Sequence, residues 1–185
     1  MTIEINNCIE KLKNGGLILY PTDTAWGIGC DATNEEAVKN VYQLKKREDS
    51  KTLICLVADQ AMLERYVEEV PDVAYDIIDL ASKPTTIVFD KPKGLAKNLI
   101  ASDNTIAIRV VSDKFCQYLI NKFGKPIIAA SVNFSGISSK NFNQIENQIL
   151  KGVDYVVNLQ VEKKNSPLSS MIKLSNNGVV KIIRE

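Results

Sequence analysis

Cationic and hydroxyl side chains cluster in short segments of the sequence that could hold an anionic ligand. Lys45 and Arg47 are two positions apart, and Ser131 and Asn133 repeat that spacing. The chain contains no histidine, which excludes Ser-His and Cys-His catalysis. The remaining groups suit phosphoryl or adenylyl transfer, in which catalysis is mostly positioning and charge stabilisation.

The segment Tyr20–Gly29 is the first candidate binding loop. It follows an apolar run and offers the hydroxyls of Thr22 and Thr24, while Gly27 and Gly29 permit close approach of a backbone. Loops that follow strands carry ligand contacts in α/β proteins. A turn stabilised by Thr and Asp side chains is an equal alternative on spacing alone.

Lys45, Lys46 and Arg47 stand at the end of a predicted helix. One interpretation is favourable pairing of cations with the negative helix end. The other is an anion clamp, and this requires the helix to end there, because positions i and i+2 do not share a helix face. Lys51 lies in the same segment, just before a predicted buried strand.

Ser131 and Asn133 follow a predicted strand, and Ser139 lies a few residues further on. Small polar side chains after a strand suit phosphate or hydroxyl binding, although an ordinary serine-rich turn fits the same pattern.

Arg109 lies inside the apolar run Thr105–Val110. An arginine buried alone costs several kcal/mol, so it requires a carboxylate partner or an anionic ligand. Because no acid near it in sequence is an obvious partner, we expect a ligand.

Helical and strand patterns alternate along the chain. Thr33–Glu36 reads as a capping box with Thr33 as the N-cap. The predicted helices cover 5–12, 34–44, 59–66, 71–81, 113–123 and 142–150. The predicted strands cover 17–20, 53–57, 85–89, 105–111, 126–130, 153–158, 169–174 and 178–184. This order predicts a single α/β domain over residues 1–185 with a mixed sheet.

Composition narrows the class of protein further. The 185 residues are 45% hydrophobic and 24% charged, as expected of a globular chain. Lys and Arg number 23 and Asp and Glu 22, so the net charge of +1 gives no overall attraction to nucleic acid. The four cysteines lie in apolar stretches without a CxxC pair, and no apolar run is long enough to span a membrane. We expect buried thiols and a cytoplasmic protein.

The ordered motifs resemble the YrdC/TsaC family of threonylcarbamoyl-AMP synthases. They are the run from Gly15 through Tyr-Pro-Thr-Asp-Thr to Ala32, the KxR at Lys45, the SxN at Ser131, and the final Ile-Arg-Glu. The resemblance implies a twisted open mixed sheet with flanking helices and a concave electropositive cavity. It also implies synthesis of threonylcarbamoyl-adenylate and pyrophosphate from L-threonine, bicarbonate and ATP with Mg²⁺. The product would pass to a transferase that modifies tRNA, and weak tRNA binding is compatible with this role.

The resemblance assigns roles to individual residues. Lys45 and Arg47 would be catalytic, holding the ATP phosphates and stabilising developing charge. The other nucleotide contacts would be Lys51, Thr105, Ser131, Asn133, Ser139 and Arg184. Threonine would be held by Thr24, Arg109 and Ser169, with Arg109 on its carboxylate. The resemblance identifies no metal ligand in the chain.

Several positions depart from the family pattern. Trp26 replaces a usual Tyr, Glu48 follows Arg47 where Pro is common, Ser82–Thr86 keeps only Pro84 and Thr86 of its motif, Phe134 follows the SxN, and Lys173 replaces a frequent Asp. These changes leave a diverged YciO-like paralogue as an alternative, although the intact SxN is unlike that branch. A non-catalytic tRNA- or double-stranded-RNA-binding module is a second alternative. Carbamoyl transfer of the hydrogenase-maturation type would need zinc-finger and acylphosphatase regions, for which this chain has no room.

Overall fold

Nine strands and six α-helices form the part of the chain that the structure describes. This computed structural model describes residues 1–46, 53–132, 142–159 and 168–185. The strands are β1 (Ile18–Pro21), β2 (Trp26–Gly29), β3 (Ile54–Val57), β4 (Thr85–Asp90), β5 (Thr105–Val110), β6 (Ile127–Ser131), β7 (Tyr155–Val156), β8 (Ser170–Leu174) and β9 (Val180–Arg184). The helices are α1 (Thr2–Lys13), α2 (Glu35–Leu44), α3 (Gln60–Tyr66), α4 (Asp72–Leu80), α5 (Lys114–Phe123) and α6 (Asn147–Gly152), with 3₁₀ turns at Lys97–Leu99 and Phe142–Gln144.

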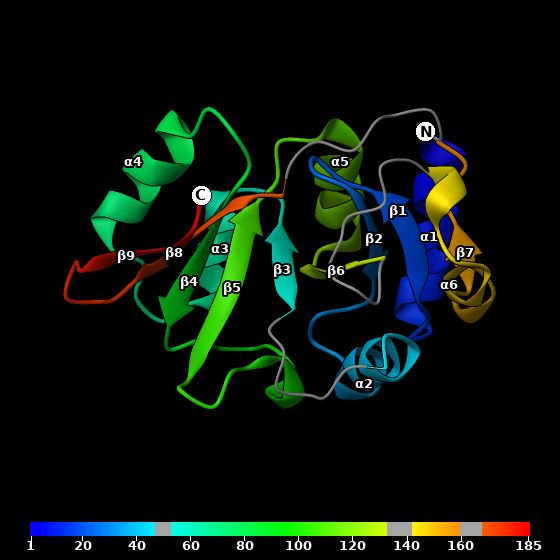
Figure 1. The fold of residues 1–185 in the computed structure, drawn as a ribbon, viewed down its shortest axis with the longest axis horizontal. Helices are drawn as coiled ribbons and strands as arrows, with labels where there is room; N and C mark the ends of the chain where they lie inside the picture. The colour runs from blue at the N-terminus through cyan, green and yellow to red at the C-terminus, as the bar shows by residue number, and fades with distance from the viewer. Residues whose placement is uncertain (47–52, 133–141, 160–167) are drawn as a thin grey trace.

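All nine strands join one open mixed sheet in the order β7-β1-β2-β6-β3-β5-β4-β8-β9 (Figure 1). Antiparallel pairing joins β1 to β2, β2 to β6, β6 to β3, β4 to β5, and β8 to β9. Strands β1 and β7, β3 and β5, and β4 and β8 pair parallel. The predicted α/β class with a mixed sheet is confirmed.

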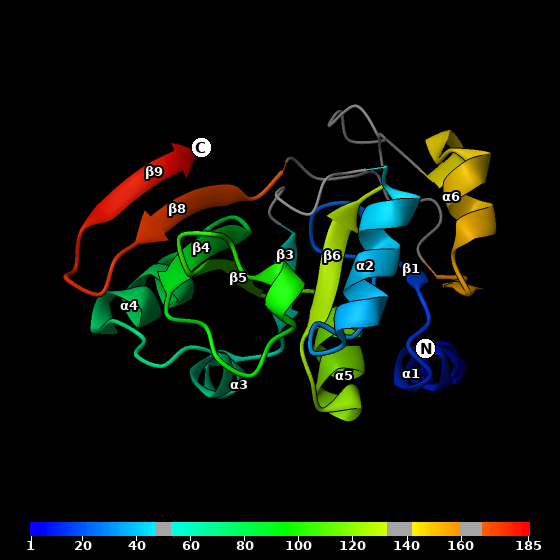
Figure 2. The same ribbon diagram turned by 90° about the horizontal axis from the view of Figure 1, so that it is seen from below.

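The helices are distributed unevenly over the sheet. Helices α1, α3 and α5 lie along one face, on the lower side in Figure 2, and their apolar stripes join the common core. On the opposite side, β8 and β9 rise at one flank and α6 at the other (Figure 2). No helix among the described residues is long and apolar enough to cross a membrane.

Strand β2 was not predicted, because its residues lie in the segment Tyr20–Gly29, which was interpreted as a binding loop. Instead, β1 and β2 form a hairpin in which Pro21 pairs with Trp26 and Ile18 with Gly29. All four residues of β2 are buried. Glycine is required at one position: a Cβ on Gly29 would lie 2.5 Å from Cε1 of Tyr20 and 3.1 Å from the carbonyl oxygen of Ile128.

Helix α2 begins one residue later than the capping box predicted. Its N-cap is Asn34, whose side-chain oxygen accepts hydrogen bonds from the amides of Glu36 and Ala37. The hydroxyl of Thr33 instead donates to Asp31 at 2.7 Å. The carboxylate of Asp31 therefore competes for Thr33, and the cap moves to the next polar residue.

Smaller differences lie near the chain's C-terminal third. The helix expected over 142–150 is a 3₁₀ turn followed by α6, and the strand expected over 153–158 shortens to β7.

Helix α4 forms as predicted but buries only Ala74. The four cysteines are buried and free, as predicted.

The two glycines of β2 should respond differently to a methyl group. We expect Gly29→Ala to destabilise the fold by about 1–3 kcal/mol, since the new Cβ would collide with the Tyr20 ring and backbone. A Cβ on Gly27 would lie 3.6 Å from Cγ2 of Thr22, an ordinary contact, so Gly27→Ala serves as the matched control. Urea denaturation measures both, and equal losses in the two variants would contradict this packing.

Candidate functional site

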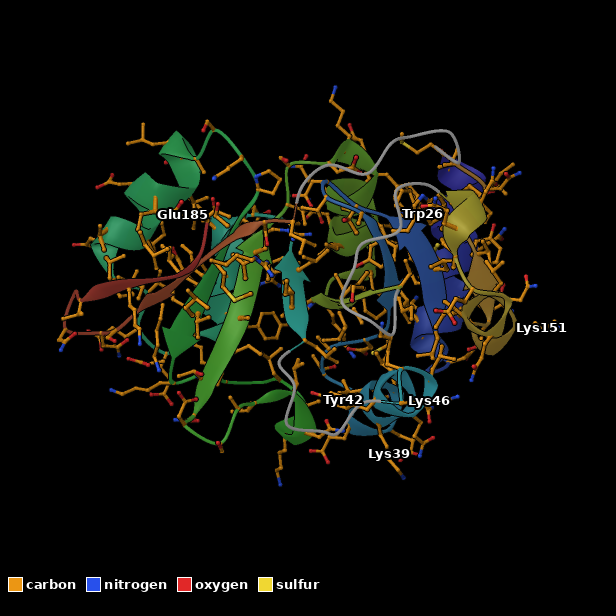
Figure 3. The ribbon with its side chains drawn as sticks, viewed as in Figure 1. Trp26, Lys39, Tyr42, Lys46, Lys151 and Glu185 are labelled. Atoms are coloured by element: carbon orange, nitrogen blue, oxygen red, sulfur yellow. The ribbon has the colours of Figure 1, made fainter. Side chains whose placement is uncertain are left out.

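A cavity of about 240 Å³ opens where six separate segments of the chain meet. They are the β1–β2 hairpin, the start of β3, the ends of β5 and β6, the start of β8 and the end of β9. The lining includes five predicted site residues: Thr24, Arg109, Ser131, Ser169 and Arg184. Its apolar lining is formed by Ala25, Trp26, Leu53, Ile54, Ala129, Ala130, Leu168 and Met171. Figure 3 labels Trp26 on one side of β3 and β5, and Glu185, next to Arg184, on the other.

The β1–β2 loop is both a stabilised turn and a wall of this cavity. The Thr22 hydroxyl donates to the carbonyl of Ala25 at 2.6 Å and accepts from the amides of Thr24 and Ala25 at 3.2 and 3.3 Å. This bonding confirms the turn interpretation and presents Thr24 to the cavity. The two interpretations of the segment are therefore compatible.

Arg109 has a carboxylate partner, contrary to the expectation that a ligand alone faces it. Its Nη2 lies 2.8 Å from Oδ1 of Asp23, and the two side chains are 3% and 5% exposed. The same nitrogen lies 3.5 Å from the Thr24 hydroxyl. Sequence proximity does not indicate this acid, because it comes from the distant hairpin loop. Nε of Arg109 has no partner among the described residues.

Ser169 and Arg184 form the opposite wall. The Arg184 guanidinium donates through Nε to the Ser169 carbonyl at 3.0 Å and through Nη2 to the Ser169 hydroxyl at 3.3 Å. The same hydroxyl lies 2.8 Å from that of Thr86, a fully buried residue of β4. The antiparallel β8–β9 pairing brings these residues together from distant positions in sequence.

Lys45 follows the last residue of α2, so the helix ends where an anion clamp would require it to end. Its side chain is buried, and its ammonium group donates to the carbonyl of Ser131 at the end of β6. The ends of α2 and β6 are thereby joined. Figure 3 shows the neighbouring Lys46 at the same end of α2. Arg47, Lys51, Asn133 and Ser139 lie outside the described residues.

Thr105 is the one described site candidate that the fold separates from the others. It begins β5, four residues before Arg109, which corresponds to about 13 Å along a strand. Its hydroxyl donates to Asp103 at 2.6 Å, and Thr105 is not among the cavity-lining residues. The proposed nucleotide contact of Thr105 thus remains a prediction.

Trp26 contributes a large apolar surface to the cavity. Its ring packs against Phe142, with centroids 4.8 Å apart and planes inclined at 59°. The Tyr20 phenol behind it donates to the carbonyl of Ile128 at 2.9 Å. Burial raises the pKa of Tyr20 well above its ordinary value, so the phenol remains a neutral donor.

Cys8, Cys30 and Cys55 supply no nucleophile to this site. Burial raises the pKa of Cys8 to about 12, and the pKa values of Cys30 and Cys55 also rise through burial. These thiols are therefore protonated at neutral pH, and the structural interpretation of the cysteines holds.

The sequence analysis did not assign a role to Asp23 or to Thr86. Asp23 lies within the quoted Tyr-Pro-Thr-Asp-Thr run, and Thr86 was noted only as a residue kept from a family motif. Asp23 is an acid between two threonines in an otherwise apolar segment. This pattern could have indicated it as the partner of the buried Arg109.

The family model described as "Telomere recombination" (Sua5/YciO/YrdC) matches residues 10–185. A putative threonylcarbamoyl-AMP synthase of Methanocaldococcus jannaschii is 34% identical over 94% of this chain and 81% of its own. A threonylcarbamoyl-AMP synthase of Pseudoalteromonas translucida is 32% identical over 93% of both chains. The chain therefore belongs to the Sua5/YciO/YrdC family.

Solved structures share the fold. The crystal structure of E. coli YciO superposes with a TM-score of 0.85 at 22% identity, over all of this chain and 90% of that one. The structure of P. abyssi Sua5 complexed with L-threonine superposes with a TM-score of 0.81 at 24% identity. That match covers 92% of this chain but only 50% of the Sua5 chain. The YrdC-like architecture is thereby confirmed.

The structure explains one departure from the family pattern. Lys173, where Asp is frequent, forms an ion pair with Asp103 at 2.9 Å. Hydrogen bonds from Thr105 and Lys173 lower the pKa of Asp103 below its usual value. Lys173 is absent from the cavity lining, so this departure changes a partly exposed contact.

We expect Asp23→Asn to destabilise the protein by about 3–5 kcal/mol, because it leaves the buried Arg109 without a counter-charge. Lys173→Ala removes an ion pair whose partners are 31% and 57% exposed, and should cost less than about 1 kcal/mol. Guanidinium denaturation of both variants measures the difference. A loss in Asp23→Asn as small as in the control would show that the buried pair does not hold the fold.

Proposed function

We propose that this chain is an L-threonylcarbamoyladenylate synthase, which makes threonylcarbamoyl-AMP and pyrophosphate from L-threonine, bicarbonate and ATP. The observation that carries the proposal is the convergence of Thr24, Arg109, Ser131, Ser169 and Arg184 on one cavity. Relatives at about 30% identity that bear the synthase name support it.

In this proposal, threonine lies against Thr24, Arg109 and Ser169. The Sua5 structure with bound L-threonine supports an amino-acid site in this fold. The Nε–H of Arg109 has no partner within the described part of the chain and would serve the substrate, while Asp23 holds the guanidinium in place. The aliphatic and aromatic lining offers a surface for the substrate's methyl group.

The nucleotide would occupy the region of Ser131 and Arg184, with Asn133, Ser139, Thr105 and Lys51 as further contacts. Lys45, held at the end of β6, and Arg47 would neutralise negative charge on the phosphates. The threonine amine attacks carbon dioxide or bicarbonate to give a carbamate. A carbamate oxygen then attacks the α-phosphorus, and pyrophosphate leaves with the electrons of the broken P–O bond.

Mg²⁺ would enter with the triphosphate, whose oxygens suit this ion. Among the described residues, no three acidic, thiol or imidazole side chains gather as a metal site. The chain's own contribution would therefore be cationic side chains and hydroxyls around the phosphates.

The product would pass to a transferase that modifies tRNA adenosines, with at most weak tRNA contact by this chain. Four free, buried cysteines suit a reducing compartment, and we place this activity in the cytoplasm.

A diverged YciO-like paralogue is the second candidate. The superposition on YciO over the whole chain favours it, as do the altered residues Trp26 and Lys83. Such a protein would keep the fold without efficient threonine-dependent pyrophosphate release.

The deciding assay combines the purified protein with ATP, Mg²⁺, bicarbonate and L-threonine and follows pyrophosphate release. We expect release that requires both threonine and bicarbonate. Omission of each substrate in turn provides the control. Release that is absent or independent of threonine would reject the synthase and favour the paralogue.

Lys45→Ala and Arg47→Ala should each slow pyrophosphate release by about 10²-fold or more, the size typical of losing one charge stabiliser. Lys39→Ala is the matched control, because Lys39 lies on the same helix with its side chain exposed and near Glu36. Circular dichroism checks that the fold persists. Wild-type rates in the Lys45 and Arg47 variants would assign these cations to helix-end stabilisation alone.

A further inference from the structure

The hydroxyl of Ser169 has two hydrogen-bonding neighbours besides the cavity that it faces. Nη2 of Arg184 lies 3.3 Å away and the Thr86 hydroxyl 2.8 Å away. Arg184 can only donate, so it occupies one lone pair of the serine oxygen. The direction of the Thr86–Ser169 bond decides what the serine presents to a ligand.

Burial fixes this direction. Thr86 is fully buried, and Ser169 is the only hydrogen-bond partner of its hydroxyl among the described residues. If Ser169 donated, the Thr86 proton would be left in the core without an acceptor, which costs about 1–3 kcal/mol. If Thr86 donates, its proton is satisfied and only acceptor capacity remains unused. The favoured arrangement has Thr86 as donor.

With Thr86 donating, both lone pairs of Ser169 are occupied and its own proton is available only to the cavity. Arg184 lines the same cavity, and only two of its donor hydrogens are used on Ser169. The two side chains therefore form a corner that only donates hydrogen bonds. Such a corner suits an oxygen of a carboxylate or phosphate and disfavours a group that itself donates.

Charge supports the same conclusion. The Arg109 guanidinium is paired with Asp23, whereas Arg184 forms no ion pair within the part of the chain that the structure describes. Of the two arginines in the cavity lining, Arg184 thus retains the charge that an anionic oxygen would neutralise.

We propose that Thr86, which does not line the cavity, is a positioning residue that makes Ser169 a hydrogen-bond donor to an anionic oxygen of the substrate. The proposal rests on the proposed function for the identity of that substrate. The oxygen belongs either to the threonine carboxylate or to a nucleotide phosphate, which share this chemistry.

Binding can be measured without turnover through the fluorescence of Trp26, the single tryptophan, which lines the cavity. L-threonine and ATP are titrated separately into wild type, Thr86→Val and Thr86→Ser. Thr85→Val is the matched control: it removes a neighbouring hydroxyl that lies outside the cavity lining and, among the described residues, bonds only the carbonyl of Lys83. Thermal denaturation establishes folding, and Thr86→Ala replaces Thr86→Val if the valine variant does not fold.

We expect Thr86→Val to weaken one ligand about 5- to 10-fold, Thr86→Ser to restore it, and Thr85→Val to leave both unchanged. If only L-threonine binds more weakly, the oxygen belongs to the threonine carboxylate. If only ATP binds more weakly, the oxygen belongs to a phosphate. Wild-type affinity for both ligands in folded Thr86→Val, or no recovery in Thr86→Ser, would overturn the positioning role. A wild type that binds neither ligand would instead remove the proposed function itself.

Discussion

A buried ion pair between a hairpin loop and a distant strand determines the geometry of the cavity. Asp23 lies in the loop between β1 and β2, and Arg109 lies on β5, while β6 and β3 separate β2 from β5 in the sheet. The pair therefore holds the hairpin loop against a strand with which the hairpin makes no backbone ladder. A buried pair adds little net stability over apolar residues, but it strongly disfavours every arrangement that leaves one charge alone. Its main effect is to specify where Thr24 stands.

The Asp23–Arg109 pair also lowers the net positive charge that the sequence motifs indicated for this site. An arginine beside a carboxylate at 2.8 Å is largely neutralised, so its remaining N–H groups act as oriented donors more than as a net charge. Attraction for anions must come from elsewhere in the cavity. Arg184 supplies it on one wall, and Lys45, close to Ser131, lies near the other. The neutral hydroxyls between these cations can then distinguish ligand groups that accept a hydrogen bond from groups that donate one.

Periodicity predicted helices α1, α2 and α5, because each buries a stripe at helical spacing. It failed at β2, where glycine normally opposes a strand but is required beneath the ring of Tyr20. The capping-box motif misplaced the cap of α2, since the Asp31 carboxylate that accepts the hydrogen bond of Thr33 is a local competitor that the motif does not include. These failures are tertiary contacts that override local preference.

The site was predictable as a list of residues but not as an arrangement. Ordered motifs identified five described residues that now share one cavity, whereas Thr105, identified in the same way, lies at the opposite end of its strand. The pairing of Ser169 with Thr86 depends on β4 and β8 being neighbours in the folded sheet, and that of Arg109 with Asp23 on where the β1–β2 loop lies across the sheet. Local sequence holds no information of that kind.

The departures from the family pattern can be weighed by what each residue touches. Lys173 is accounted for by Asp103 and has no contact with the cavity. Trp26 does line the cavity, and its packing against Phe142 makes the larger ring part of the wall. The Thr86 hydroxyl, kept within an otherwise altered segment, bonds the cavity residue Ser169. Among the described residues, the only partner of this buried hydroxyl is the cavity residue Ser169. Valine would fill the same space and leave no polar group to satisfy, so the fold alone does not require a threonine at position 86. Continued ligand binding explains the retained hydroxyl more easily.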